Sequence, residues 1–520
     1  VNFKGGEKEL LKKGRGAEFF SGSNFGAQKF NNCGQNVDTS PCNAKGITLI
    51  ALIITIVIML ILAGITINLT LGENGIFQKA KLAKGQYETA SVQEKLELEL
   101  AAMQMGRQTD LTVEEYVDGL EEKGIVLQEN IFPRETETAI KIGEKIFVVY
   151  QEGTKIEVYH EEGNVMMSDT NTWTNPDTWL NTNIDRSQIK TIQFEKTNIV
   201  PDEVVGSSNI EAEGQETGAV KCWWTEEAGG VTVGEETKTA YNITIGANGG
   251  VIAPRNCTSL FRHMINLTSI NFKQDGISCF NTKNTTNMSF MFWGCEELGS
   301  LQLDENFDTS KVTNMKYMFR QCKKITSLDL SNSNFDTKNV TKMEYMFANM
   351  TLLEELDLGD KFNANEVLNM AYMFHECVVL SDLDLGTGFS AKKVTDIRWM
   401  FCHCDVLTSV DLGDNFDTSS VNNMSMMFAW CANLQYIDLG EKFSTKNVTK
   451  ADYMFEIISD LKMLNLGNFG IERLETINIG GIFSATSTSN CELIIKKSAK
   501  DWFYENCRSK ANWRTVEEID

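Results

Sequence analysis

Residues 307–330 read FDTSKVTNMKYMFRQCKKITSLDL, and this stretch is one unit of a repeat that decides the fold. The Met-Phe pair within it recurs along the second half of the chain, beginning at residues 291, 318, 346, 373, 400, 427 and 454. Five of the six intervals are 27 residues and the other is 28. A period of this length is typical of solenoids, in which each unit buries its apolar side chains against its neighbours.

Each unit contains two apolar patterns. Met315, Met318, Phe319 and Cys322 have the i, i+3, i+4, i+7 spacing of one helix face. Ile325, Leu328 and Leu330 then supply apolar anchors, and the last two alternate with Asp329 as a half-buried strand requires. We therefore predict an α/β repeat solenoid of the leucine-rich-repeat type with a period of about 27, in which parallel strands stack on one side and helices cover the other.

Several of these motifs match a known repeat pattern. Val312-Thr-Asn-Met and Val421-Asn-Asn-Met resemble each other, and Phe307-Asp-Thr-Ser recurs as Phe416-Asp-Thr-Ser. On these motifs the array resembles the BspA-type leucine-rich-repeat surface proteins of bacteria. The resemblance covers residues 258–495, and it implies an extracellular role in adhesion or binding without naming a ligand.

The outward positions of the predicted strands form the candidate binding face. An aspartate recurs in five units, and another side chain of the same face precedes it by two positions. The candidate residues are Ser327, Asp329, Glu355, Asp357, Asp382, Asp384, Ser409, Asp411, Tyr436 and Asp438. Adjacent parallel strands lie about 4.8 Å apart, so such a column of carboxylates needs solvent, cations or a basic partner. The column is either a solvated sheet face or a binding face for a cationic surface or Ca²⁺, and we take the second as the site hypothesis.

The 13 cysteines are an odd number and cannot all pair within the chain. Five of them share one repeat position, which Met350 takes in a further unit: Cys295, Cys322, Cys377, Cys404 and Cys431. We expect buried free thiols there, while disulfides between neighbouring units stay open for an oxidising compartment. His375, Cys402 and His403 lie in two adjacent units and suggest zinc. Because the other cysteines of those units are core residues, too few ligands remain, and we predict no metal and no cofactor.

An apolar segment precedes the repeats. Residues 47–71 are 25 residues without a charge, which as a helix would be about 37 Å long and would exceed the roughly 30 Å hydrocarbon core of a membrane. Seven basic residues lie upstream in 1–45, against three in the twenty residues downstream. This bias predicts a single-pass protein with a cytoplasmic N-terminus and extracellular repeats.

The start of this segment resembles a type IV prepilin. Lys45 and Gly46 precede Ile47-Thr-Leu-Ile and the apolar helix. The resemblance implies cleavage between Gly46 and Ile47, and possible assembly with pilin-like subunits. Most pilins have glutamate at the fifth mature position, whereas this chain has Ala51. An ordinary signal anchor is the alternative.

The remaining boundaries follow from composition and local pattern. We predict a leader at 1–46 that is either cleaved or a misassigned start, the membrane helix at 47–71, and a pilin-like helix with a small α+β head at 72–165. Within the head we expect helices at 76–106 and 112–123 and a hairpin over 140–159. A linker at 166–184, an N-terminal cap at 185–257, the repeats at 258–495 and a C-terminal cap at 496–520 complete the chain.

Composition narrows the function. With 48 Lys+Arg against 71 Asp+Glu, the formal charge is −23, which argues against nucleic-acid binding. Four histidines in 520 residues leave little material for acid–base chemistry, and we find no catalytic motif. We predict a membrane-anchored surface protein, not an enzyme, whose repeats bind an extracellular protein or host-surface ligand. A minor pilin or pseudopilin is the first alternative, and a surface enzyme is the second.

Overall fold

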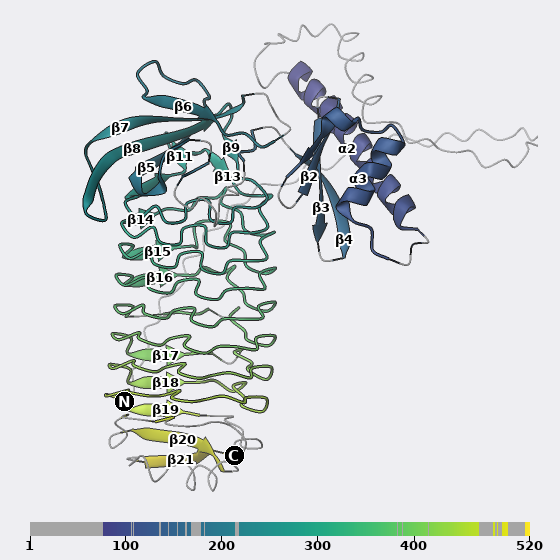
Figure 1. The fold of residues 1–520 in the computed structure, drawn as a ribbon. Coiled ribbons are helices and arrows are strands. Elements are labelled where there is room, and N and C mark those ends of the chain that lie inside the picture. The colour runs from purple at the N-terminus through teal and green to yellow at the C-terminus, as the bar shows by residue number, and fades with distance from the viewer. Residues whose placement is uncertain are drawn as a thin grey trace, which may run out of the picture. The chain divides into compact units, whose positions relative to one another are not determined.

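The structure of the protein is a computed structural model (Figure 1). It describes residues 76–466, apart from 106, 108, 135–136, 144, 153, 162–163, 168–177, 181, 214–217, 382, 387 and 414, together with 482–483, 486, 491–497 and 515–519. The predicted leader, the Gly46–Ile47 cleavage site, the segment 47–71 and Asp382 lie outside the described residues.

The first described unit combines two helices with an antiparallel sheet. The helices are α2 (Ile76–Gln104) and α3 (Val113–Glu122), followed by the short 3-10 turn η1 (Gln128–Asn130). The sheet has the order β1-β2-β3-β4, with β1 at Ile131–Pro133, β2 at Glu137–Ile142, β3 at Lys145–Glu152 and β4 at Lys155–Glu161. These elements confirm the two helices and the antiparallel pairing of β3 with β4, whereas the first strand of the predicted hairpin over 140–159 is divided between β2 and β3.

The core of this unit lies between the helices and one face of the sheet. Tyr116 and Leu120 of α3 are fully buried with Leu96 of α2 and Phe147 of β3. The Tyr116 hydroxyl donates to the Leu96 carbonyl oxygen at 2.6 Å, so the buried phenol has a partner. Helix α3 begins at a capping box, since Thr112 Oγ1 accepts from the Glu115 N–H at 3.1 Å and the Glu115 carboxylate accepts from the Thr112 N–H at 2.9 Å.

The membrane prediction needs correction. None of the helices in the part of the chain that the structure describes is long and apolar enough to cross a membrane. Helix α2 carries lysines and glutamates along its length and is no exception. The single-pass anchor and the transmembrane, pilin-like helix of our predicted fold class therefore receive no support.

A six-stranded sheet leads into the repeats. Its order is β14-β10-β5-β8-β7-β6, and the strands from β14 to β8 are parallel to their neighbours. Strands β7 and β8 form a long antiparallel hairpin, and β6 is antiparallel to β7. The 3-10 turn η2 (Arg186–Gln188) precedes β5. The strand bounds are β5 Ile189–Glu195, β6 Gly206–Asn209, β7 Val220–Val233, β8 Glu236–Ala247, β10 Ser269–Asn271 and β14 Ser300–Leu301.

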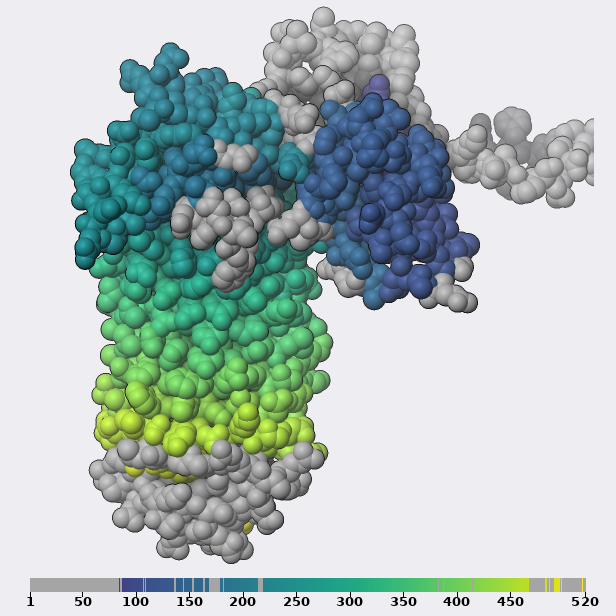
Figure 2. Space-filling view, viewed as in Figure 1, coloured from purple at the N-terminus to yellow at the C-terminus, as the bar shows by residue number. Residues whose placement is uncertain are grey.

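The repeats form stacked coils, most of which contain a short strand (Figure 1). Strand β15 pairs in parallel with β16, and β17, β18, β19, β20 and β21 form one further parallel sheet. Coils also meet at short strands outside this column. On the face shown in Figure 2, successive coils form a continuous surface. The bounds are β9 Val251–Ile252, β11 Lys273–Gln274, β12 Ile277–Ser278, β13 Phe280–Asn281, β15 Ser327–Asp329, β16 Glu355–Asp357, β17 Ser409–Asp411, β18 Tyr436–Asp438, β19 Met463–Asn465, β20 Glu492–Lys496 and β21 Thr515–Ile519.

The helices that we predicted within the repeats do not form, so the α/β assignment is wrong. Among the described residues, the helices are α2, α3, η1 and η2, and all of them precede the first Met-Phe pair. Each Met-Phe segment is instead a run of turns. We call these the turn segments: 287–295, 314–322, 342–350, 369–377, 396–404, 423–431 and 450–458.

Backbone geometry explains why no helix forms. Tyr317 and Gln321 have φ of 62° and 61°, and the same two positions are left-handed in every turn segment. A right-handed helix cannot pass through such residues. The N–H groups of 315, 317, 319 and 321 donate to carbonyl oxygens of 342, 344, 346 and 348 in the next coil, at 2.9 to 3.0 Å. The apolar residues of the pattern still point inward, since Met315, Met318, Phe319 and Cys322 are all fully buried.

The first coil, at residues 257–263, has no coil before it to donate N–H groups to its carbonyl oxygens. Buried side chains supply donors to them instead. The Arg186 guanidinium donates to the carbonyl oxygens of Ser259 at 3.2 Å, Leu260 at 3.4 Å and Arg262 at 2.9 Å. The Trp179 indole N–H donates to the Leu260 oxygen at 2.7 Å. Both side chains are buried, and each satisfies acceptors that would otherwise be costly.

Candidate functional site

The strands place the predicted face at the surface. Ser327 pairs with Glu355 and Asp329 with Asp357, while Ser409 pairs with Tyr436 and Asp411 with Asp438. The first seven of these eight residues are exposed, in strands whose middle residues, Leu328, Leu356, Val410 and Ile437, are buried. Asp384 is also exposed, but its coil has no assigned strand, so the column is interrupted there.

The aspartates of this face have a structural role that we did not predict. Oδ1 of Asp357, Asp384 and Asp411 accepts the backbone N–H of the glycine two residues later, at 2.8 to 2.9 Å. Those glycines have φ near 70°, a conformation that other residues rarely adopt. Each aspartate therefore closes an Asx turn. Among the described residues, the second carboxylate oxygen of these three side chains receives no hydrogen bond and stays available to solvent or a partner.

Asp329 closes the same kind of turn with more donors. Its Oδ1 accepts from the Ser331 hydroxyl at 2.6 Å and the Ser331 N–H at 2.8 Å, and Asn332 donates to Oδ2. The Ser331 hydroxyl and these further donors hold the pKa of the Asp329 carboxyl below its ordinary value. The Asp329 carboxyl is therefore ionised, and both of its oxygens accept hydrogen bonds from the residues that follow it.

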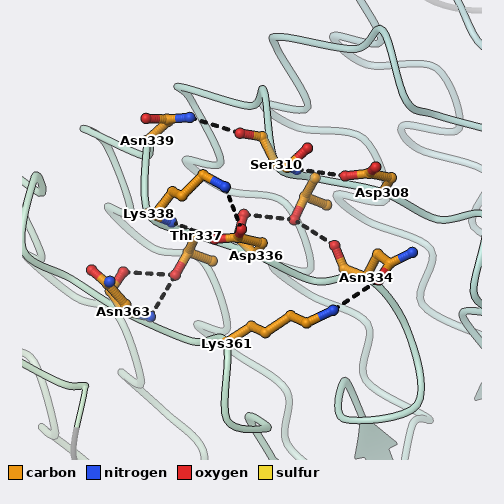
Figure 3. Close-up of polar contacts among 10 residues, drawn as sticks. Asp308, Ser310, Asn334, Asp336, Thr337, Lys338, Asn339, Lys361 and Asn363 are labelled. Carbon is orange, nitrogen blue, oxygen red and sulfur yellow. Dashed lines mark hydrogen bonds and ion pairs between the residues drawn. The ribbon is translucent and has the colours of Figure 1, made fainter. Parts of the chain in front are cut away.

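In a second set of turns, side-chain hydrogen bonds link neighbouring coils (Figure 3). Oδ1 of Asp308 and of Asp336 accepts the backbone N–H two residues on, at 2.8 and 3.0 Å. Between coils, side chains donate as follows: Thr337 Oγ1 to the Asn363 oxygen at 2.6 Å, Asn339 Nδ2 to the Ser310 oxygen at 2.7 Å, and Lys361 Nζ to Asn334 Oδ1 at 2.8 Å. These polar residues bind one another, which assigns them to the scaffold.

The cysteine column is buried and unpaired, as expected. Each of the five thiols donates to a phenylalanine carbonyl oxygen in the preceding coil, for example Cys322 to Phe292 at 3.3 Å and Cys431 to Phe401 at 3.0 Å. Burial raises the pKa of Cys295 and of Cys377 to about 12, so these thiols are poor nucleophiles and poor metal ligands. His375 Nδ1 lies 3.1 Å from the Cys402 carbonyl oxygen, and no group of three metal-ligating side chains occurs among the described residues.

The turn segments carry a feature that the sequence analysis missed. The first left-handed position of five consecutive segments holds an aromatic ring, and the rings stack with centroids 4.3 to 5.5 Å apart: Phe290, Tyr317, Tyr345, Tyr372 and Trp399. When the repeat units are aligned with one another, the sequence shows that this position is aromatic in these five units, but it does not show that the rings stack. We name this partly exposed row the aromatic ladder.

The comparisons with known proteins bear on the repeats alone. Residues 255–385 and 379–494 each match the family model described as "Mycoplasma protein of unknown function, DUF285". The matches span 240 residues together, just under half of the chain. No curated protein matches the chain. The match does not identify the BspA-type leucine-rich-repeat family or a pilin-like N-terminus, and it supports a surface-repeat protein whose function that family description leaves open.

Proposed function

We propose that this surface-repeat protein binds a cationic protein partner, in adhesion, through the strand face, meaning the outward residues of β15 to β18 with Asp384. The observation that carries the proposal is charge. The eight outward positions of β15, β16, β17 and β18 hold four aspartates and one glutamate and no lysine or arginine.

The scaffold supports binding more than catalysis. Apart from Asp384, each carboxylate lies on a strand that pairs in parallel with a neighbouring strand, and Asx turns hold the aspartates in one orientation. Like charges held at a spacing of about 4.8 Å repel one another, so a basic surface that covers them relieves the repulsion and lowers the free energy. We propose a binding role for the strand face and assign it no catalytic step.

The test removes charge and keeps the turns. Asparagine retains the side-chain oxygen that accepts the glycine N–H, so Asp357→Asn, Asp384→Asn and Asp411→Asn together leave the Asx turns intact. Beads coated with the full chain are scored for adhesion to cultured epithelial cells at low and high salt. We expect the triple variant to lose most adhesion, and the unmodified chain to lose it at high salt.

A matched control has the same chemistry elsewhere. Asp308, Asp336 and Asp417 also close Asx turns, but they lie outside the strand face. Their triple asparagine variant changes the net charge equally and should adhere normally. Equal loss in both variants would show that net charge, not the strand face, governs adhesion, and would refute the proposal.

A further inference from the structure

Most of the aromatic ladder is already covered by cations of the chain itself. The Arg320 guanidinium carbon lies 5.3 Å from the Tyr317 ring centroid and 4.9 Å from that of Tyr345. The Arg398 guanidinium lies 5.8 Å from the Tyr372 centroid. A guanidinium over an aromatic face is a favourable contact, so this part of the ladder is electrostatically satisfied within the molecule.

The last two turn segments differ. The ladder stops at Trp399, because the next segment has Met426 at the equivalent position. Beyond it, Trp430 and Tyr453 are 43% and 38% exposed. Among the described residues no lysine or arginine lies over either ring, and no ring stacks on Tyr453. These two aromatic side chains therefore have surface that the chain leaves open.

Carboxylates replace the cations around this open surface. The Trp430 indole N–H donates to Glu456 Oε2 at 3.2 Å. The His403 ring meets Trp430 edge to face at 4.4 Å, and His403 Nδ1 lies 3.5 Å from Asp405 Oδ1. One carboxylate thus bonds the indole directly, and a second lies beside the histidine that packs against it.

The two coils are held in register. The Met426 N–H donates to the Asp452 oxygen at 2.8 Å, and the Trp430 N–H to the Glu456 oxygen at 2.7 Å. Trp430 and Glu456 therefore lie in adjacent coils whose backbones are bonded to each other. A ligand that contacts both side chains needs no rearrangement of the backbone.

We propose that Trp430 and Glu456 form a site for an arginine side chain of a partner protein. The contacts of Arg320 with Tyr317 and Tyr345 show, within the same molecule, how this face takes a guanidinium. At the open end the described residues supply an aromatic ring and a carboxylate but no cation. Arginine fits better than lysine because its planar guanidinium stacks on a ring while its N–H groups bond a carboxylate.

The experiment titrates the full chain with a blocked nine-residue peptide that contains three arginines and is otherwise glycine and serine. Tryptophan fluorescence and calorimetry report binding. Two comparison peptides replace every arginine by citrulline, which keeps the shape without the charge, or by lysine. We expect the arginine peptide to bind about tenfold more tightly than the citrulline peptide, and the lysine peptide to fall between them.

Variants separate this site from the strand face. Trp430→Ala should weaken the arginine peptide about tenfold, and Glu456→Gln severalfold, while Tyr436→Ala, an exposed aromatic on the strand face, leaves it unchanged. The triple asparagine variant of the strand face should also bind the peptide normally. Equal binding of the arginine and citrulline peptides, or full binding by Trp430→Ala with its melting temperature unchanged, would overturn the inference. A peptide lost only with the strand-face variant would place the cation there instead.

Discussion

Helix α3 and the turn segments have the same spacing of apolar residues and different structures. Val113, Tyr116, Val117 and Leu120 of α3 stand at i, i+3, i+4 and i+7, and they form a regular helix. The turn segment 314–322 has the same offsets, and all four of its apolar residues are buried without one turn of α-helix. The periodicity that predicts a buried face therefore does not determine the path of the backbone.

The difference lies in where the backbone N–H groups find acceptors. Those of α3 bond within their own helix, which the capping box begins. Those of a turn segment can bond a neighbouring coil, and four of them do. Holding two non-glycine residues left-handed costs roughly 1–2 kcal/mol each, and four hydrogen bonds at about 1 kcal/mol each with added ring stacking offset it. A repeated sequence makes this possible because each coil brings its own acceptors.

The largest effect is expected where one coil's core is removed. Phe319 is fully buried and stacks between Phe292 and Phe347, with centroids 5.7 and 5.6 Å away. Phe319→Ala should cost about 3–5 kcal/mol of stability and expose the amides of the adjacent coils to hydrogen exchange, while those of α3 stay protected. Phe319→Leu should cost clearly less. Uniform loss of protection in α3 and the coils would contradict the separation of the two regions.

The next effect concerns the first coil. Arg186→Met removes a donor from three carbonyl oxygens, of which those of Ser259 and Leu260 keep a second donor, and we expect about 2 kcal/mol of destabilisation by urea unfolding. Trp179→Phe removes one hydrogen bond and keeps the ring, so it should cost about 1 kcal/mol. A neutral Arg186→Met would mean that water satisfies these oxygens as well as the guanidinium does.

Smaller effects are expected from two variants that remove a side-chain hydrogen bond at the start of α3 and at the start of the turn segment 314–322. Thr112→Ala breaks the capping box of α3 and should cost about 1 kcal/mol. Asn314→Ala removes the side-chain oxygen that accepts the Lys316 N–H at 3.2 Å, and should cost about half as much, since inter-coil bonds hold that segment in place. Thermal melting of both variants measures the difference, and a larger cost for Asn314→Ala would reverse the argument.

The smallest effect is a gain. Ile457 is β-branched and has a φ of 53°, while Asn349 occupies the equivalent position with a φ of 60°. Ile457→Asn should raise stability by about 0.5–1 kcal/mol, because asparagine tolerates the left-handed region. A loss of stability in denaturant unfolding would show that the apolar contact of Ile457 outweighs its strain.

The sequence allowed some of this to be predicted and not the rest. The repeat period, the buried positions and the pairing of Asp329 with Asp357 all follow from alternation and spacing. The prediction of helices was wrong because an α-helix with 3.6 residues per turn and this run of turns bury residues at the same sequence offsets. The Asx turns could have been predicted from Asp-Leu-Gly at 357–359, 384–386 and 411–413. Trp179 could not, because its acceptor is 81 residues away in the chain.

The uniform direction of the inter-coil bonds has a consequence for the whole stack. In each of the first six turn segments four N–H groups point toward the following coil, so their peptide dipoles add along the stack as they do along a helix. The end at residues 257–263 then has partial negative charge. Arg186 lies at that end, and the carbonyl dipoles there serve as its counter-charge, which is how a buried guanidinium is accommodated on a scaffold of neutral amides.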